Sequence, residues 1–569
     1  MNKLYGKKYW WVLLLLLFVA VNLIAYSFHA RFDLTKEKRY TLNKSTKDLL
    51  RNLDDDISID VFLKGDFPSG FKKLANSTED FLRVVKEYNS SKINYRFIAP
   101  EEDFEDSGVK YGDTLMNLGA NRINLTVQIK GGQQQKFIFP VALISYKGKQ
   151  RLVNLYGGSS REISQVEINN AEATIEYKFV KALERLMTNA KALVGYSVGN
   201  GEPTPADANT FDLVQTVQRD NTFFTLNLNN QPYIDDTFKV LMIVKPSVQF
   251  TDLEKLKIDQ FLMRGGNLLF FIDELFAEQD SLQFKPETIA FDRNLNLADI
   301  LFRYGVRINP DLIMDLQCDF LPFAVGGTND NPQFEFLQWS YYPVFQSRNN
   351  HLINKNLGLV AGRFVNSIDT IHTNGINKTI LLSSSENSRT ISTPAMISLN
   401  ENRNLPEAGK YSKSNIPVGV LLEGPFSSLY RNRISKSRMD TLASMNVPFR
   451  ESAIAGKIIV VADGDIVLNE VSPKEGPLPL GLNLFTVGSK YEYQFANRDF
   501  LLNCLEFLTD KPGIIEIRNK DIVLRLLDSR KVNEQKAFWQ FINIGVPVLL
   551  VLFFGIIYYQ ARKKKYARS

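Results

Sequence analysis

The residues best placed for chemistry are a glycine-rich loop and three aspartates, each of which follows a hydrophobic run. If these runs are parallel strands, their carboxyl ends share the edge of the sheet at which α/β proteins bind ligands. Four carboxylates meeting there could hold Mg²⁺ or Ca²⁺, which both prefer oxygen ligands. The candidate ligand-binding residues are Gly199, Asn200, Gly201, Glu202, Asp273, Asp463 and Asp465.

Each of these features also has a structural explanation. Glycines permit tight turns, and carboxylates that follow strands commonly cap helices. The loop lacks the third glycine of a dinucleotide fingerprint, and the sequence contains no Gly-x-x-x-x-Gly-Lys-Ser/Thr motif for ATP. The sequence leaves ligand contact and a structural turn open, and we predict no catalytic residue, cofactor or resident metal.

The cysteines and histidines do not support nucleophilic catalysis. Cys504 lies in an expected helix and Cys318 in an expected loop, while the histidines are His29, His351 and His372. Neither thiol lies on a strand-to-helix turn beside a histidine, which is the arrangement that activates a cysteine. A disulfide between the two cysteines stays open, because sequence alone does not place their Cα atoms within reach.

Two long hydrophobic runs, residues 9–28 and 541–559, bracket the chain. Each is long enough to cross a bilayer core of about 30 Å. Basic residues precede the first run and follow the second, and they account for the net charge of +6. Because Lys and Arg stay in the cytoplasm, we predict two spans of the bacterial inner membrane, cytoplasmic termini and a large periplasmic region. A cleaved signal peptide is the alternative for the first run.

Periodicity predicts two α/β regions between these runs. In the first, a βαβ unit precedes further strands and a helix, which is the order of a thioredoxin-like domain. Pro68-Ser69-Gly70-Phe71 occupies the place where a redox enzyme has Cys-x-x-Cys, so we predict a binding or structural module. The expected strands are 57–63, 93–98, 122–129, 136–146 and 150–155, and the expected helices are 71–88 and 166–188.

The second region alternates near-continuous hydrophobic strands with helices, which is typical of a parallel sheet covered on both faces. Residues 277–452 interrupt this pattern with short strand segments among polar loops. We interpret them as an insertion, and a separate β-rich domain is the alternative. The expected strands are 192–198, 239–244, 267–272 and 457–461, with short strands or strand fragments in 334–344, 354–371, 379–391 and 418–423, and the expected helices are 211–219, 253–263 and 498–508.

The string RFDLTKEKRYTL, directly after the first hydrophobic run, resembles the signature of the GldG-type accessory subunits of ABC transporters, which are linked to gliding motility in Bacteroidetes. The resemblance implies a flavodoxin-like sheet similar to class I glutamine amidotransferases, and a multi-span permease and a cytoplasmic ATPase as partners. Related proteins often carry Gly-His-Gly-Glu where Asn200 stands here, and this difference weighs against acid–base chemistry. The signature residues are Arg31, Asp33, Leu34, Thr35, Arg39, Tyr40 and Thr41.

Together these observations predict a non-catalytic, membrane-anchored extracytoplasmic subunit of an ABC-type transporter complex in gliding motility or secretion. A membrane-tethered scaffold or sensor for sugar or peptidoglycan is the alternative, and a hydrolase using the four carboxylates is a third account. The predicted organisation is a membrane anchor (1–30), a thioredoxin-like domain (31–189), an amidotransferase-like domain (190–276 and 453–515) with a β-rich insertion (277–452), a linker (516–537), a membrane helix (538–560) and a basic tail (561–569).

Overall fold

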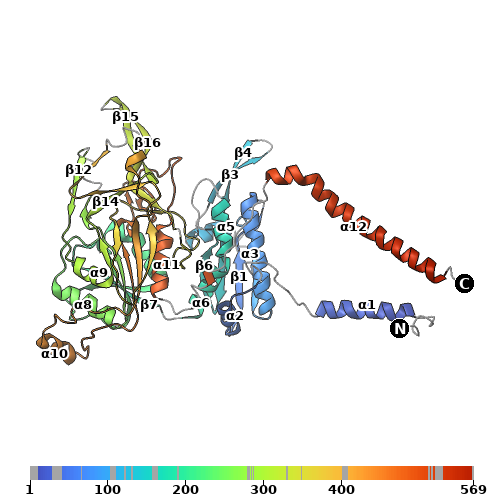
Figure 1. Cartoon of the computed structure of the whole chain (residues 1–569), viewed down its shortest axis with the longest axis horizontal. Helices are drawn as coiled ribbons and strands as arrows, with labels where there is room; N and C mark the ends of the chain where they lie inside the picture. Colours follow the sequence, from blue (N-terminus) through green and yellow to red (C-terminus); the bar gives the residue numbers. More distant parts are fainter. Residues whose placement is uncertain are drawn as a thin grey trace. The chain divides into compact units, whose positions relative to one another are not determined.

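The structure is a computed structural model of a mixed α/β protein (Figure 1). Residues 1–521 form one compact unit and residues 522–569 a second. The structure describes residues 10–27, 41–65, 67–102, 110–118, 120, 123–129, 132–156, 165–188, 191–277, 282, 285, 287–328, 331–347, 349–399, 408–509, 513, 517–518 and 529–566.

The first folded region is built on a four-stranded sheet with the order β2-β1-β5-β6. β1 is parallel to β2 and antiparallel to β5, and β3 pairs with β4 in a separate hairpin. The apolar positions of β1 and α3 face one hydrophobic core. The elements are α2 (Lys44–Arg51), β1 (Ile57–Val61), α3 (Ser69–Tyr88), β2 (Ile93–Phe97), α4 (Tyr111–Asn117), β3 (Ile123–Ile129), β4 (Gly132–Ile138), β5 (Val141–Tyr146), β6 (Lys149–Asn154), α5 (Gln165–Ala173) and α6 (Ile175–Met187).

Two expected elements of this region are each divided. The expected strand 136–146 is wrong as one strand, because Pro140 has no N–H and lies between β4 and β5. The expected helix 166–188 is two helices that meet at Thr174. Its hydroxyl donates to the carbonyls of Asn170 and Ala171, a side-chain bond that competes with regular helix geometry.

The main sheet of the second region has seven strands in the order β19-β22-β23-β10-β9-β7-β8. β8, β7, β9, β10 and β23 run parallel, and β22 and β19 continue the sheet in antiparallel pairs. The elements are β7 (Ala192–Val198), α7 (Phe211–Asp220), β8 (Asn221–Asn227), β9 (Phe238–Val244), α8 (Asp252–Met263), β10 (Asn267–Phe271), β19 (Asn377–Ser383), β22 (Pro417–Gly424), β23 (Gly456–Val461) and α11 (Asn497–Thr509).

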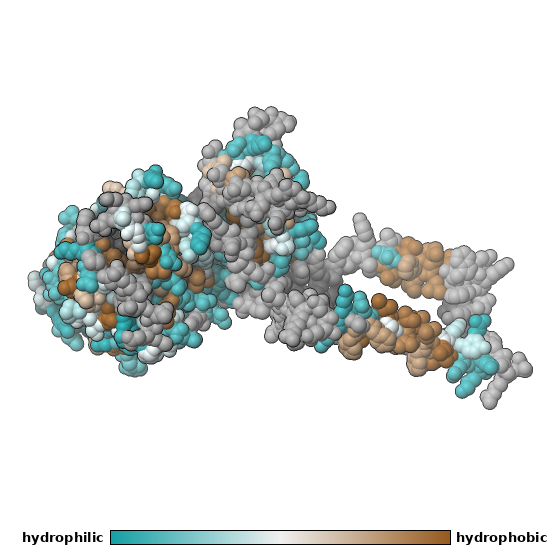
Figure 2. All heavy atoms as spheres, turned by 90° about the horizontal axis from the view of Figure 1, so that it is seen from above, coloured by the Kyte–Doolittle hydropathy of each residue, from teal (hydrophilic) through white to brown (hydrophobic). Residues whose placement is uncertain are grey.

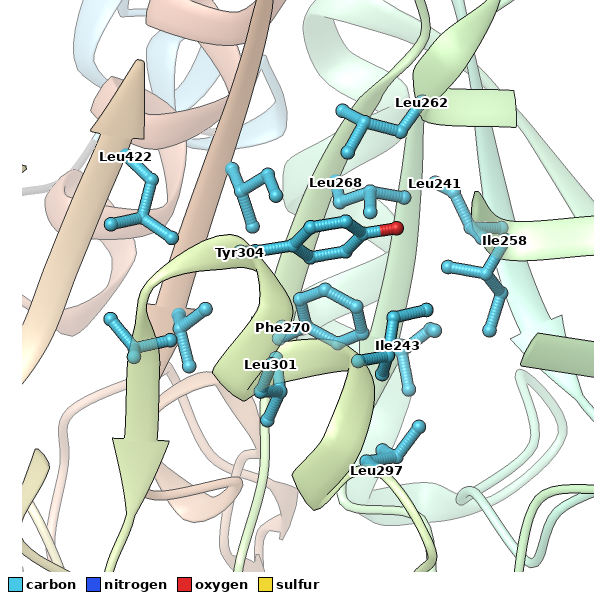
Figure 3. Close-up of a cluster of buried hydrophobic side chains, with 14 of the residues drawn as sticks. Leu241, Ile243, Ile258, Leu262, Leu268, Phe270, Leu297, Leu301, Tyr304 and Leu422 are labelled. Carbon is cyan, nitrogen blue, oxygen red and sulfur yellow. The ribbon is translucent and has the colours of Figure 1, made fainter. Parts of the chain in front are cut away.

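Alternate residues of these strands enter two hydrophobic cores, one on each face of the sheet. Leu241 and Ile243 of β9 share a core with α8 and α9 (Ala298–Tyr304). Figure 3 shows this core, in which Tyr304 of α9 packs near Phe270 of β10. Val240, Met242 and Val244 instead share a core with α7 and α11. Because helices cover both faces of this sheet, the ends of its strands are the places where polar side chains can cluster.

Residues 277–452 supply β19 and β22 to the main sheet, and their other strands form small sheets. The segments 354–371 and 379–391 were expected to hold short strands or strand fragments, and the structure confirms this: the first contains β17 and β18, and the second contains parts of β19 and β20. Cys318 begins β15 and does not lie in a loop. The remaining elements are β11 (Leu275–Phe276), β12 (Glu287–Asp292), β13 (Val306–Ile308), β14 (Asp311–Asp315), β15 (Cys318–Thr328), β16 (Asn331–Phe345), β17 (Val360–Ala361), β18 (Ile368–Thr370), β20 (Ser388–Ser392), β21 (Ala395–Ser398), α10 (Lys436–Ser444), β24 (Val471–Ser472) and β25 (Gly476–Pro477).

Helices cover both hydrophobic runs at the ends of the chain. α1 spans Trp10–Ser27, and α12 spans Ser529–Tyr566 with Pro547 inside it. Among the described residues, the segment Phe538–Lys564 of α12 is long and apolar enough to cross a membrane. Figure 2 shows hydrophobic colouring along the middle of α12, where its apolar side chains are exposed. This hydrophobic exposure is typical of a helix that meets lipid or another protein.

Candidate functional site

The predicted site residues lie at the carboxyl ends of parallel strands. The loop 199–202 follows β7, Asp273 follows β10 by two residues, and Asp463 and Asp465 follow β23. β7, β9, β10 and β23 are consecutive neighbours in the sheet, so these residues share one edge. The structure holds them in two separate networks.

The first network joins the three aspartates to Lys245, the residue that follows β9. The Lys245 ammonium is 2.7 Å from a carboxylate oxygen of Asp465 and 3.5 Å from one of Asp273. The Gly464 N–H donates to Asp273 at 2.6 Å, and the Asp465 N–H donates to Asp463 at 2.7 Å. The predicted convergence of these aspartates is therefore correct, and a lysine lies among them.

A second cation reaches this network from residues 277–452. The Arg363 N–H donates to Asp463 at 2.8 Å, and its guanidinium pairs with Glu470 and stacks over the Tyr342 ring at 5.3 Å. Gly362 lies so close that a Cβ there would be 2.7 Å from the Asp463 carboxylate. The cavity that remains beside Arg363 and Asp465 has a volume of about 20 Å³, room for about one water molecule.

Burial and these cations set the protonation of the aspartates. Burial raises the pKa of Asp273 to about 6, although Lys245 opposes the shift. Burial, together with the neighbouring Asp273 and Asp465, raises the pKa of Asp463 well above its usual range. Burial opposes ionisation of Asp465 as well, but Lys245 and Arg363 lower its pKa below the usual value. The network therefore keeps Asp465 ionised and favours a proton on Asp463.

The described part of the chain contains no group of three or more His, Cys, Asp and Glu side chains arranged to hold a metal ion. In the aspartate network, ammonium and backbone N–H donors occupy the positions around the carboxylates. Buried charges are stabilised by such partners, and this network already has them. The arrangement therefore holds together the three loops that follow β9, β10 and β23 at the edge of the sheet.

The second network contains the glycine loop. Gly199 and Gly201 have φ values of 121° and 74°, which favour glycine. A Cβ on Gly201 would be 2.1 Å from Ser247 Oγ, a hydroxyl that donates to the Gly201 carbonyl. The Asn200 N–H donates to Glu202 at 2.7 Å, and the Ser247 N–H donates to the Asn200 carbonyl at 2.9 Å. The structural role of the two glycines is thus evident in their geometry.

Sequence reasoning missed the two cations and Glu254. Lys245 follows a hydrophobic strand just as the aspartates do, so the same positional rule applied to basic residues would have found it. Arg363 lies in an irregular segment and has no local signal. Glu254 is the fourth residue of a Thr-x-x-Glu capping box that begins at Thr251. Its position in the first turn of α8 could therefore have been predicted from the sequence.

The remaining predicted residues lie away from this edge or outside the described residues. Cys318 and Cys504 are both buried and free, and burial raises the pKa of the Cys504 thiol well above its usual value. His351 lies against the Phe507 ring with centroids 5.0 Å apart. His29 and the signature residues up to Tyr40 are not among the described residues, whereas Thr41 is.

A broad hollow of about 510 Å³ lies in the β-rich segment, away from this edge. Its lining includes Tyr341 of β16, Glu287 of β12, and Arg389 and Met396 from β20 and β21. Tyr341 donates to the Met396 carbonyl at 3.4 Å, and Ser398 donates to Glu287 at 3.3 Å. The hollow combines charged, aromatic and aliphatic groups, as binding surfaces commonly do.

Comparison with solved structures finds weak likenesses. The mmIFT52 N-terminal domain is 12% identical, with a TM-score of 0.31, over 57% of this chain and 99% of that one. A putative ThuA-like protein from Parabacteroides merdae ATCC 43184 is 8% identical, with a TM-score of 0.25, over 56% of this chain and 91% of that one. TM-scores this low support no conclusion about fold or function.

Comparison with known sequences is more informative. An uncharacterized protein from Borreliella burgdorferi is 19% identical over 549 residues, which is 94% of either chain. A domain of unknown function, DUF7088, matches residues 36–145. The family described as an ABC-type uncharacterized transport system matches residues 191–504, more than half of the sequence. The chain therefore belongs to this family of auxiliary components of ABC-type transport systems.

Proposed function

We propose that this chain is a non-catalytic, membrane-anchored extracytoplasmic subunit of an ABC-type transporter complex, of the GldG type that serves gliding motility or secretion. Family membership supports the transport role. The observation that most favours a non-catalytic subunit is the aspartate network. Its carboxylates, which a hydrolase would need, are occupied by the Lys245 ammonium and by backbone N–H groups, including that of Arg363. The GldG type rests on the resemblance of residues 31–42.

The proposed fold has a thioredoxin-like domain followed by a flavodoxin-like domain. The order β2-β1-β5-β6, with β5 antiparallel to β1, supports the first. The order β8-β7-β9-β10-β23 supports the second, because it corresponds to the order 2-1-3-4-5 of flavodoxin-like sheets. The seven signature residues follow the first hydrophobic run and lie at the start of the proposed domain 31–189.

The proposed topology has two spans of the inner membrane and both termini in the cytoplasm. The helices α1 and α12 cover the two hydrophobic runs, which supports a span at each end. Basic residues flank both runs on the terminal side, as the positive-inside rule requires. Under this topology the two α/β regions are periplasmic, where an envelope component can reach them.

A multi-span permease and a cytoplasmic ATPase are the proposed partners. The chain has no P-loop motif, and two spans are few for a transport pathway, so the complex must obtain both from other subunits. Gly545 and Gly555 lie in the hydrophobic part of α12. Small residues let membrane helices pack closely, and a Cβ on Gly555 would meet nothing within 4 Å.

Purification of the intact chain from its native membrane in mild detergent tests this function, with mass spectrometry and an ATPase assay on the eluate. An ABC ATPase and a permease in near-fixed ratio, with turnover lost when they are washed away, is the expected result. Recovery of the protein alone or with envelope components would favour the membrane-tethered scaffold, with the hollow at Tyr341 as its binding surface.

A matched pair of variants sharpens this test. Gly555→Leu adds a side chain at an open position of α12, and we expect it to reduce recovery of the permease severalfold. Val551→Leu is the control, because Val551 is already large and is 73% exposed. Equal recovery from both variants would place the permease contact elsewhere.

A further inference from the structure

Four side chains, at the end of β7, in the loop that follows it and in the first turn of α8, each have a buried oxygen atom without a hydrogen-bond partner. They are Ser197, Asn200, Glu202 and Glu254, and their unpaired atoms are Oγ, Oδ1, Oε1 and Oε1 respectively. The side chains are all nearly inaccessible, with exposed fractions of 0, 2, 5 and 1%. An unsatisfied buried polar group costs about 1–3 kcal/mol, and native proteins contain few of them.

These residues converge where the chain passes from β7 and β9 into α8. The Ser247 and Val248 N–H groups donate to the Asn200 carbonyl at 2.9 and 2.8 Å, which joins the two loops. The Phe250 and Thr251 segment then leads directly into α8, where Thr251 forms the N-cap. β7 and β9 are adjacent strands, and the chain direction across the sheet reverses between them. Open α/β sheets bind ligands at this point.

Both glutamates use one carboxylate oxygen to fix their own loop and leave the other unpaired. Glu202 Oε2 accepts the Asn200 N–H at 2.7 Å. Glu254 Oε2 accepts the Thr251 N–H and hydroxyl, both at 2.7 Å. The Oε1 atom of each residue therefore has a fixed position and an unused acceptor capacity.

Within the described part of the chain, neither of these two buried carboxylates forms an ion pair, in contrast to the carboxylates of the aspartate network. Burial raises the pKa of Glu202, while the nearby Ser197 hydroxyl and the Asn200 N–H oppose the shift. The Glu254 carboxylate adds to the rise, so the two carboxylates lie close enough to repel. Lys257 lies one turn further along α8, and the Glu254 charge opposes the lowering of the Lys257 pKa by burial. The Lys257 ammonium nevertheless donates to the Leu228 carbonyl at 2.5 Å and forms no ion pair with Glu254. Placing a positive charge between the glutamates would remove this repulsion.

The space available favours a very small occupant. A Cβ on Gly201 would overlap Ser247 Oγ, and a Cβ on Gly199 would be 3.1 Å from Asn227 Oδ1, so the loop is closely packed. All four side chains are also covered by the rest of the fold. Such close packing excludes a sugar or a peptide and leaves a single ion as the candidate occupant.

We propose that Ser197, Asn200, Glu202 and Glu254 bind one divalent cation, Mg²⁺ or Ca²⁺, through their unpaired oxygens. Carboxylate, amide and hydroxyl oxygens are the ligands that these hard cations prefer, and water can complete the coordination. The cation links the loop after β7 to the start of α8 and so stabilises this edge of the sheet. This site is distinct from the aspartate network and does not depend on the transporter role.

Cation titration of the full-length protein in detergent, after EDTA treatment, tests the proposal. We expect CaCl₂ or MgCl₂ to raise the unfolding temperature in a saturable manner, since binding to the folded state stabilises it. Calorimetry on the same samples gives the affinity and distinguishes the two cations. Monovalent salt at matched ionic strength controls for screening.

The double variant Glu202→Gln/Glu254→Gln keeps the shape and one acceptor oxygen of each residue. We expect it to bind the cation at least ~10-fold more weakly, as loss of two charged oxygen ligands implies. In EDTA we expect it to unfold at a higher temperature than the wild type, because it lacks the two buried charges. Glu475→Gln changes an exposed glutamate and should behave as the wild type does.

Two outcomes would overturn the proposal. One is equal cation affinity in the wild type and the double variant, which would place binding elsewhere. The other is the absence of cation binding to the wild type at millimolar concentration, whatever the stability of the double variant in EDTA. That result would mean that a shared proton or buried water serves these oxygens.

Discussion

Two groups of buried carboxylates lie at the same edge of the main sheet, and their charges are balanced in different ways. Asp273 and Asp465 pair with Lys245, and Arg363 reaches Asp463 and Glu470. Glu202 and Glu254 bond to their own loops and each keep an unpaired oxygen. The aspartates of the first group have ion-pair and hydrogen-bond partners within the protein, whereas each glutamate of the second group keeps one oxygen without a partner. A cluster of acidic residues therefore points to a bound ligand only if its carboxylate oxygens lack partners within the protein.

The largest expected effect comes from removing Lys245, the cation between the aspartates of the first group. Lys245→Met leaves Asp273 and Asp465 buried without their ammonium partner, and we expect a loss of about 3–5 kcal/mol in the free energy of unfolding. Denaturant titration of the detergent-solubilised chain, followed by circular dichroism, measures it. Lys474→Met at an exposed position is the control. Equal effects of the two variants would show that the network contributes little.

The second test uses pH. The pKa of Asp273 is raised to about 6 in the folded state, so between about pH 4 and 6 the folded state holds a proton that the unfolded state has lost. The free energy of unfolding should therefore fall as pH rises through this window. Asp273→Asn retains an acceptor for Gly464 and should remove this part of the fall, on the order of 2–3 kcal/mol.

Unfolding titrations of both proteins at half-unit pH steps from 4 to 7 give the difference between the two curves. We expect the wild-type value to fall relative to the variant as pH rises. A difference that stays constant over this range would contradict a raised pKa of Asp273. Glu475→Gln should reproduce the wild-type curve, because Glu475 is exposed.

A third test concerns the packing of the second group. Gly201→Ala introduces a Cβ that would overlap Ser247 Oγ at a φ of 74°, and we expect a loss of about 2–3 kcal/mol. Gly476→Ala has nearly the same φ of 77° but meets nothing within 4 Å, so it should lose only about 1 kcal/mol. Thermal unfolding of both variants measures the difference, and equal losses would mean that Ser247 moves away freely.

The smallest expected effect comes from the cap that positions Glu254. Thr251→Ala removes the hydroxyl that completes the capping box of α8 and should cost about 1 kcal/mol in the free energy of unfolding. Thr251→Ser keeps the hydroxyl and should be close to the wild type. If both variants also bind cations with wild-type affinity, the cap does not position the proposed ligand Glu254.

Much of the parallel sheet was predictable because its strands are continuous hydrophobic runs. The prediction for β7 is correct at both ends, and those for β9, β10 and β23 are correct to within one residue at each end. The strand β8, NTFFTLN, was missed, since it follows α7 without an intervening turn and carries polar residues. Local patterns identify buried strands well and edge strands poorly, because an edge strand is exposed on one side.

The site was predictable only in part for a different reason. The three aspartates of the site come after strands, and the rule for parallel sheets predicts that such residues share one edge of the sheet. Arg363 and Asp463 are 100 positions apart, and Lys245 and Asp465 are 220 positions apart. No periodicity or local motif connects such pairs. The position of Lys245 after a strand was open to the same rule, but its pairing with Asp465 and the contact of Arg363 with Asp463 came only from the structure.

By itself, the sequence determined which residues end the hydrophobic strands, where the long apolar helices lie and that no P-loop is present. These properties depend on local order along the chain, through hydrophobic periodicity, capping residues and motif spacing. Only the tertiary structure decided which carboxylates have a cationic partner and which keep an unpaired oxygen. Ion pairs and hydrogen bonds depend on distances of a few ångströms in space, and folding brings those atoms together from distant parts of the chain.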